Sequence, residues 1–283
     1  MREFILRARK APTAANFSLD NLPDAGHMEI VAGCISNALF YNGRLLDGTS
    51  AESRPPLVPA MPPVFACDVS SGSETLAGHS FENRLEAECI AHCLGLLHAH
   101  VLQHPTTTEN DEEEEEAAAA AGEDDDESDD ESDDDAEFDD GPKPRGKRTK
   151  REPETIGPSI GVIVFYKAQI EAIERVLAAK APAALAALDI QVATVDSFQG
   201  REKDIILVSC VRSGAVMGHS AEPERVNVAV TRARHHLGIF GSRKTMSTSP
   251  LWRDVLQRVA GPGRRALCHE GLLMAASMAE LFQ

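Results

Sequence analysis

Residues 160–179 read IGVIVFYKAQIEAIERVLAA, and this stretch decides the class of fold. The run Ile160–Phe165 is apolar apart from one glycine, which predicts a short strand buried on both faces. Lys167 to Ala179 is predicted to be a helix, because apolar side chains recur at helical spacing on one face: Ile170, Ile173, Val176 and Leu177. A buried strand that leads directly into such a helix is typical of α/β proteins.

The same alternation continues on both sides of this unit. Further strands are predicted at Val64–Cys67, Ile190–Val195, Asp204–Val211 and Leu237–Gly241. Further helices are predicted at Ser80–Leu102, Pro223–Arg234 and Leu251–Val259, the first with Asn83 and Glu86 at capping-box spacing near its start. Strands that are apolar throughout and alternate with helices predict a parallel sheet with helices on both faces.

The composition is that of a folded protein and argues against two classes of protein. The 283 residues are 42% hydrophobic, which is enough for a core in one or two domains. Six cysteines are too few for a small disulfide scaffold. No apolar run approaches the ~20 residues that a membrane helix needs, and no N-terminal pattern resembles a signal peptide. We therefore expect an intracellular protein that neither spans a membrane nor is secreted.

The net charge of −17 comes from one tract. Residues 111–140 hold 20 of the 45 acidic side chains and no Lys or Arg, so the other residues carry 25 acids and 28 bases. Acidic groups at this density repel one another, and we expect residues 105–154 to be a disordered insertion. The nearly neutral remainder leaves nucleic-acid binding by the folded part open.

The basic run 143–151 within this insertion has two interpretations. It carries six Lys and Arg residues. It is either a solvated tail that folds back on the acidic tract or a nuclear-import signal, so the sequence leaves nucleus and cytoplasm open.

Two patterns resemble sites without meeting their physical requirements. Gly141–Arg148 nearly fits the phosphate loop G-x-x-x-x-G-K-[ST], but no strand precedes it, two prolines remove N–H donors and Arg148 replaces the hydroxyl residue. Cys89, His92 and Cys93 share one helix face, but ligands at knuckle spacing are missing. We therefore expect these cysteines to pack in the core rather than to bind zinc.

Three segments carry the polar side chains from which a site could be built. The strand at Ile160–Phe165 runs into Tyr166 to Gln169. Residues 192–204, VATVDSFQGREKD, lie between two predicted strands, and such strand ends are where open α/β sheets bind ligands. Residues 227–234, NVAVTRAR, hold two arginines that would point about 200° apart on a helix, so that one could enter a cleft and contact phosphate. Taken alone, these segments could equally be polar surface loops and a charged helix.

These segments resemble the second RecA-like motor domain of superfamily 1 helicases, and above all its up-frameshift/senataxin branch. Val195–Asp204 resembles motif V of that branch, and Asn227–Arg234 resembles its motif VI. Three further segments carry the likeness: Gly161–Gln169, similar to the family's G-I-I-T-P-Y-K-A-Q; residues 36–45, similar to the signature that opens the second domain; and Pro250-Leu251-Trp252, similar to the closing helix. The likeness covers residues 27–104 and 155–260 in the family's order.

The resemblance implies a role for each residue that matches a motif. Arg232 would be the arginine finger on the γ-phosphate of ATP, and therefore the catalytic residue. The other nucleotide-binding residues would be Gln199, Gly200 and Glu202. The nucleic-acid strand would be bound by Thr194, Ser197 and Lys167, and the motif VI helix would be braced by Asn227 and Thr231. For all of these except Arg232 and Gly200, plain structural support stays an alternative.

The sequence also departs from the family pattern. Val164-Phe165 stand where the family has Thr-Pro, which removes a hydroxyl expected to contact phosphate, and His219-Ser220 stand where Phe-Leu is usual. The Gln, Tyr and Arg of the family's Q-Y-R-M-H-P-E-I stretch are absent before His27, and with them a second phosphate-binding arginine. Residues 1–26 match no pattern that we recognise, and the sequence holds no usable Walker A or Walker B motif.

The resemblance implies a doubly wound α/β domain of RecA type, built from residues 27–104 and 155–283, interrupted by residues 105–154 and preceded by an unassigned segment 1–26. The family binds ATP with magnesium between two such domains, and the first domain supplies the phosphate loop and the magnesium ligands. We therefore expect single-stranded RNA or DNA and a first motor domain, in cis or in trans, as partners, and no membrane. The leading hypothesis is the C-terminal piece of an ATP-dependent helicase. A self-standing, non-catalytic module that binds nucleic acid or a partner protein, and an unrelated α/β protein, stay alternatives.

Overall fold

A computed structural model describes residues 35–44, 57–104, 155–259 and 265–282. The strands are β1 Val64–Asp68, β2 Glu74–Ala77, β3 Ser80–Asn83, β4 Ile160–Val164, β5 Ile190–Thr194, β6 Lys203–Ser209, β7 Ala233–Gly241 and β8 Arg265–Cys268. The helices are α2 Arg84–Gln103, α4 Ala168–Lys180, α5 Pro182–Ala187, α6 Pro223–Val230, α7 Arg243–Met246, α8 Pro250–Val259, α9 His269–Met274 and α10 Met278–Phe282. Two 3₁₀-helices, η3 Val195–Phe198 and η4 Gly218–Ala221, and a further helix at residues 35–40 complete the described part.

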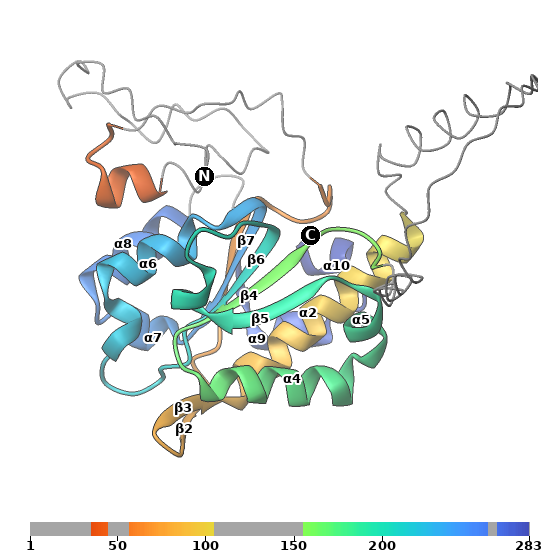
Figure 1. Ribbon diagram of the computed structural model, residues 1–283, viewed down its shortest axis with the longest axis horizontal. Coiled ribbons are helices and arrows are strands. Elements are labelled where there is room, and N and C mark those ends of the chain that lie inside the picture. Colours follow the sequence, from red (N-terminus) through yellow and green to blue (C-terminus); the bar gives the residue numbers. More distant parts are fainter. Residues whose placement is uncertain (1–34, 45–56, 105–154, 260–264, 283) are drawn as a thin grey trace, which may run out of the picture. The chain divides into compact units, whose positions relative to one another are not determined.

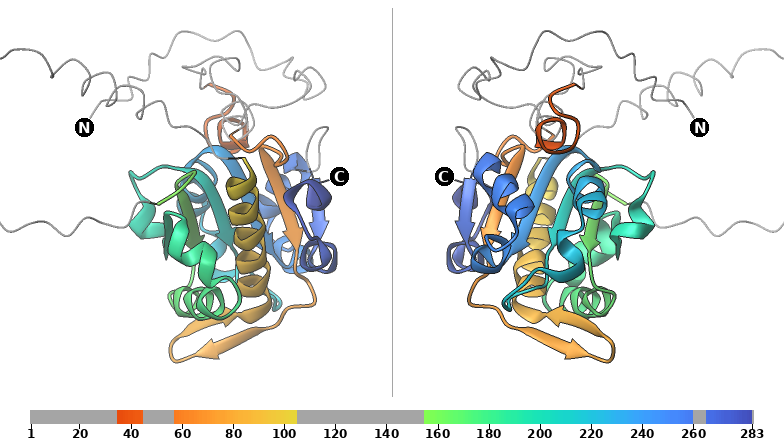
Figure 2. Two further views of the ribbon diagram at one scale, coloured as in Figure 1. Left: turned by 90° about the vertical axis from the view of Figure 1, so that its right-hand side faces the viewer. Right: turned by 90° about the vertical axis from the view of Figure 1, so that its left-hand side faces the viewer.

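Six strands form one parallel sheet in the order β5-β4-β6-β7-β1-β8, as the apolar runs predict. Helices cover both faces, with α2, α4, α5, α9 and α10 on one and α6, α7 and α8 on the other (Figures 1 and 2). Alternate residues of each strand enter the two cores: Val162 packs towards α4, and Ile163 towards η3 and α8. The predicted fold class, a parallel sheet between two layers of helices as in RecA-like domains, is confirmed.

The folded unit is assembled from chain on both sides of residues 105–154. Helix α2 precedes this segment, and it packs against α4, which follows it. Gly157 lies so close to the end of α2 that an added Cβ would stand 2.8 Å from Cγ1 of Val101. The two points where the chain leaves and re-enters the domain therefore lie near each other. Segment 1–26, the predicted disorder of 105–154, the sequence Gly141–Arg148 and the basic run lie outside the described residues.

Two boundaries differ from the prediction. Residues 80–83 do not begin a helix but form β3, which pairs with β2 through the two-residue turn Gly78-His79, where Gly78 has a φ of +62°. The helix starts after Asn83, whose side chain accepts a hydrogen bond from the N–H of Glu86, and this confirms the predicted cap. The helix predicted at Pro223–Arg234 ends at Val230. Arg232 lies in a turn and Arg234 in β7, so the argument from their separation on a helix was wrong.

The remaining sequence-based expectations concern the cysteines and the membrane. Cys89 and Cys93 of α2 are buried in the hydrophobic core, as expected. Nε2 of the neighbouring His92 lies 3.0 Å from the carbonyl oxygen of Ala275. Among the described residues, no helix is both long enough and apolar enough to cross a bilayer.

Candidate functional site

The residues expected to bind the nucleic-acid strand meet at one edge of the sheet. Thr194 ends β5 and Ser197 lies in η3, and their hydroxyl oxygens are 3.1 Å apart. Thr194 stands beside Val164, the last residue of the neighbouring strand β4, and Lys167 follows three positions later with an exposed side chain. Two hydroxyls and an ammonium group therefore gather where β4 and β5 end.

The residues expected to bind the nucleotide lie at the other ends of the strands. Gln199, Gly200 and Glu202 form the exposed connection from η3 to β6, in which Gly200 has a φ of +79° that favours glycine. The N–H of Lys203 donates to the carbonyl oxygen of Arg232 over 3.1 Å, which places this connection beside the start of β7. Glu202 and Arg232 thus belong to neighbouring segments at the amino ends of β6 and β7.

A glycine in β4 allows the chain to pass from one edge to the other. A Cβ on Gly161 would lie 2.8 Å from the ring of Phe198 and 2.6 Å from Cδ1 of Ile206. The ring of Phe198 therefore packs closely against the sheet at the second residue of β4, and η3 can lead back across the sheet from Thr194 to Gly200. The bare backbone at Gly161 thereby determines where the 199–202 connection runs.

The two arginines of the NVAVTRAR segment have different surroundings. Arg234 lies 3.7 Å from carboxylate oxygens of both Glu202 and Asp204. Arg232 is half-buried and its guanidinium donates to the carbonyl oxygen of Val228 (3.3 Å) and to Oγ1 of Thr231 (3.0 Å), and no carboxylate of the described residues forms an ion pair with it. The guanidinium of Arg232 is held in place by uncharged acceptors, and its charge is not neutralised by them.

Asn227 and Thr231 stabilise the segment around Arg232. The Asn227 carboxamide accepts from the Ser36 hydroxyl at 2.8 Å and donates to the Tyr41 hydroxyl at 3.2 Å, which joins residues 35–44 to α6. Oγ1 of Thr231 donates to the carbonyl oxygen of Asn227 at 2.7 Å. These bonds fit the bracing role that the resemblance implies for both residues.

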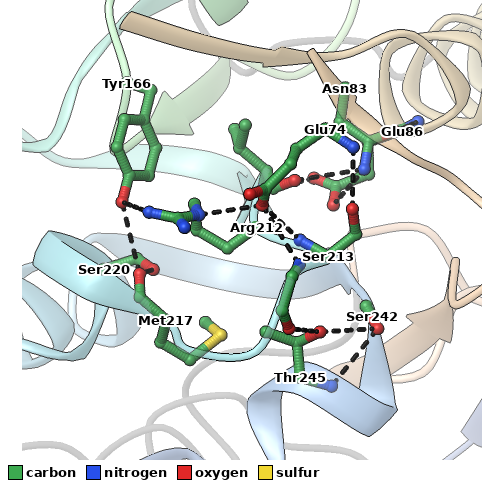
Figure 3. Close-up of polar contacts among 12 residues, drawn as sticks. Glu74, Asn83, Glu86, Tyr166, Arg212, Ser213, Met217, Ser220, Ser242 and Thr245 are labelled. Carbon is green, nitrogen blue, oxygen red and sulfur yellow. Dashed lines mark hydrogen bonds and ion pairs between the residues drawn. The ribbon is translucent and has the colours of Figure 1, made fainter. Parts of the chain in front are cut away.

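Sequence reasoning missed a polar network at the carboxyl ends of β4 and β6, which Figure 3 shows. Arg212, just after β6, donates to Glu74 of β2 (2.8 Å) and to the hydroxyl of Tyr166 (3.3 Å), and it stacks over the ring of Phe81 (4.4 Å). Burial lowers the pKa of Arg212, but its bonds to Glu74 and Tyr166 outweigh this and raise it. The only signal in the sequence was a charged residue directly after an apolar strand.

The same network holds Val211 in a conformation that a β-branched residue rarely adopts, with a φ of +68°. Its N–H donates to Oε2 of Glu86 at 2.9 Å, and its carbonyl oxygen accepts from Nδ2 of Asn83 at 3.1 Å. Ser209 also donates to Glu86, and Gln169 of α4 donates to Ser209 at 3.1 Å. The first turn of α2 therefore fixes the end of β6, and backbone strain of this kind is often found near functional sites.

A cavity of about 520 Å³ opens elsewhere, between the β7–β1–β8 side of the sheet and α7 and α8. Its floor includes Ala66 and Ile239, and Arg243 and Arg253 contribute to its wall. None of the predicted site residues lines it.

Comparisons with known proteins agree with the sequence motifs. A family model described as an AAA domain matches residues 147–244. These residues include Lys167, Thr194 and Ser197 at one end of the strands, and the 199–202 connection and Arg232 at the other. The "Regulator of nonsense transcripts 1 homolog" of Arabidopsis thaliana is 53% identical over 70 residues, 24% of this chain and 6% of that protein. The "Probable helicase senataxin" of Mus musculus is 41% identical over 106 residues, 35% of this chain and 4% of that protein. The chain is similar to the C-terminal region of superfamily 1 helicases of the Upf1 and senataxin type.

A third relative, the mouse "5'-3' DNA helicase ZGRF1", is 29% identical over 227 residues, 80% of this chain but 9% of that protein. The chain thus spans less than a tenth of the length of each of these three relatives. A second family model, described as a putative SAM-dependent RNA methyltransferase, matches residues 1–47, a segment of which the structure describes only residues 35–44.

Proposed function

We propose that the chain acts as the second motor domain of an ATP-dependent RNA or DNA helicase, with Arg232 as the finger on the γ-phosphate. The contrast between the two neighbouring arginines supports this proposal. Arg234 forms ion pairs with Glu202 and Asp204, whereas the guanidinium of Arg232 donates to uncharged acceptors within the described residues. A positioned guanidinium of this kind stabilises the negative charge on a phosphoryl group during transfer. Gln199, Gly200 and Glu202 would line the same side of the nucleotide.

The second half of the proposal concerns the strand. Thr194, Ser197 and Lys167 offer two hydroxyls and one ammonium at a single edge, and such groups contact phosphates and do not read base edges. We therefore expect binding of single strands with little sequence preference and with strong salt dependence. Both RNA and DNA meet this description.

The rest of the reaction needs a first motor domain, in cis or in trans. That domain would supply the phosphate loop, the magnesium ligands and the catalytic carboxylate, and ATP with magnesium would lie between the two domains. Within the described part of the chain, the two hydrogen bonds of the Arg232 guanidinium use Nε and Nη2, which leaves Nη1 to donate to a phosphate oxygen. The surroundings of Arg232 therefore fit an anionic group.

Strand binding is tested by fluorescence anisotropy with labelled oligo(U) and oligo(dT). Lys167→Ala and Ser197→Ala should each weaken binding severalfold at low salt. Lys180→Ala is the matched control, because Lys180 lies at the other end of α4 and is paired with Glu88. If the wild-type chain binds neither oligonucleotide, the helicase proposal is wrong.

The role of Arg232 is tested by ATP hydrolysis. The chain alone should hydrolyse no ATP, because it has no phosphate loop to hold the β-phosphate. Mixed with the separately expressed first motor domain of a related helicase, it should support turnover that Arg232→Ala reduces about 10³-fold or more. Arg234→Ala is the control and should reduce turnover far less. Equal reductions in the two variants would contradict the assignment of Arg232 as the arginine finger. Strand binding that no added nucleotide or first domain alters would instead favour the non-catalytic module.

A further inference from the structure

Tyr166 lies between the strand-binding edge and the interior of the domain. It directly precedes Lys167, yet its side chain is only 7% exposed. Its ring packs edge-on against Phe81, with ring centroids 5.6 Å apart. Its hydroxyl accepts a hydrogen bond from Arg212 at 3.3 Å and donates one to the carbonyl oxygen of Met217 at 3.2 Å (Figure 3). The residue next to Lys167 is therefore bonded to the loop that follows β6.

This loop holds the hydroxyl of Tyr166 at close range. Gly218 has a φ of +59°, and a Cβ added to it would lie 2.9 Å from both the Tyr166 hydroxyl and Nη1 of Arg212. The hydroxyl of Ser220 donates to the same Met217 carbonyl oxygen at 2.6 Å. Met217 thus accepts from two buried hydroxyls, and a displacement of Tyr166 would break one of the two bonds or move the loop.

The loop in turn sets the start of α6. Among the described residues no side-chain hydrogen bond caps the first turn of α6, and the 3₁₀-helix η4 directly precedes this turn. The indole N–H of Trp252 fixes η4 by donating to the carbonyl oxygen of Ser220 at 2.6 Å. A second tie comes from Arg225 of α6, which bonds both carboxylate oxygens of Asp196, between Thr194 and Ser197, at 3.2 Å. Thr231 and Arg232 follow directly after the far end of α6.

We propose that Tyr166 is a positioning residue that joins the strand-binding edge to Arg232 through the 211–222 loop and α6. A strand bound at Lys167 would displace Tyr166, and the Met217 bond would transmit this displacement to the first turn of α6. Because α6 is a short helix that ends at Val230, a shift of its first turn moves the segment that presents Arg232. This inference rests on the proposed function, since it assumes that the strand binds at Lys167.

The test follows the side-chain Nε–Hε resonance of Arg232 in the full ¹⁵N-labelled chain, assigned by its loss in Arg232→Lys. Addition of oligo(U) should shift this resonance in the wild type. Tyr166→Phe keeps the ring and its packing but removes both hydrogen bonds, so it should abolish the shift while the oligonucleotide affinity stays within about twofold. Gly218→Ala, which crowds the hydroxyl, should do the same. Thr248→Val, which removes a hydroxyl that donates to the carbonyl oxygen of Thr245 three residues earlier, is the control that keeps the shift.

The outcomes separate the two proposals. If oligo(U) binds and the Arg232 resonance does not move in the wild type, or still moves in Tyr166→Phe, the positioning role is wrong and the strand-binding proposal stands. If the wild type binds no oligonucleotide, the proposed function fails and the inference fails with it. A purely structural role of Tyr166 would lower the melting temperature of the variant without removing the shift.

Discussion

The carboxyl group of Glu86 shows how burial and hydrogen bonding compete at a single residue. Burial raises the pKa of Glu86 from its ordinary value near 4.5 to about 8, although Ser209 and the N–H groups of Val211 and Cys210 donate to it and lower the pKa. The folded state therefore keeps a proton at pH values where the unfolded chain has already lost it. Its contribution to stability is fully present below pH 4.5 and is lost as the pH rises through 8.

We expect Glu86→Gln to remove this pH dependence. The amide oxygen can still accept from Ser209 and Val211, and the amide does not ionise. The free energy of unfolding of the wild type should fall relative to that of the variant between pH 5 and pH 8, by up to ~1.4 kcal/mol per pH unit. Urea unfolding at several pH values measures both, and parallel profiles would show that Glu86 titrates as an ordinary carboxyl group.

His236 gives the opposite pH dependence. Burial lowers the pKa of His236 to about 4, against a raising effect of the Pro62 carbonyl oxygen, which accepts from Nδ1 at 3.1 Å. Nε2 accepts from the N–H of Val58 at 3.1 Å, so the folded state requires the neutral ring. The unfolded chain binds the proton first, and stability should fall as the pH drops from 6.5 towards 4.

NMR titration of the ring Cε1–H resonance tests this expectation for His236. The resonance should stay constant down to about pH 5, and urea unfolding should show the matching loss of stability below pH 6.5. In His236→Asn, whose amide can replace the bond to Pro62 without titrating, the loss should be smaller. A titration midpoint near 6.5 in the folded protein would contradict the structure.

At the scale of elements, the sequence predicts the sheet better than it predicts the site. Strands such as β4 and β6 are continuous apolar runs, because parallel strands are buried on both faces, and this pattern is visible without any structure. The β2–β3 hairpin was missed because its strands are short and half exposed. The end of α6 was missed because residues 231–234, Thr-Arg-Ala-Arg, are all compatible with a helix, whereas the pairing of Ala233 with Lys203 starts a strand there.

The candidate site, like the fold, was predicted only where a local pattern in the sequence reveals it. The residues of the motifs lie on connections whose sequence order is readable, so Thr194 and Arg232 were named in advance. The network around Arg212 depends on contacts between residues far apart in the chain, such as Glu74 with Ser213, and no local pattern predicts these. Strain at Val211 is likewise visible only once Asn83 and Glu86 are seen to hold both of its backbone groups.

The crossing of η3 over β4 leads to a prediction at this scale. Gly161→Ala places a methyl group against Phe198 and Ile206, so it should destabilise the domain by ~1–3 kcal/mol and shift the backbone resonances of residues 199–202. Gly95→Ala in α2 is the matched control, because the nearest atom to its Cβ is 3.9 Å away. This change should stabilise the domain by ~0.5–1 kcal/mol. If both variants unfold at the same urea concentration, the close approach at Gly161 does not affect the free energy of unfolding.

At the scale of the whole molecule, the contact between Gly157 and Val101 predicts the effect of removing the insertion. Deletion of residues 106–152 joins chain ends that already lie near each other, so a short loop can connect them. The melting temperature of the deleted chain should stay within a few degrees of that of the full chain. Differential scanning calorimetry measures both, and loss of the cooperative transition would show that residues 106–152 contribute to the core.

The position of β1 has a consequence for synthesis on the ribosome. Val64 lies opposite Leu237, and Cys67 opposite Leu267, so the first strand of the sheet is flanked by strands from the other end of the domain. At ~5–20 residues per second, the ribosome needs on the order of ten seconds or more to proceed from β1 to β8. Until β7 is translated, the segment VFACD lacks both of the strands that flank it in the sheet, and the acidic tract 111–140 is translated in that interval. The nascent chain can therefore close its sheet only after Cys268 has left the exit tunnel.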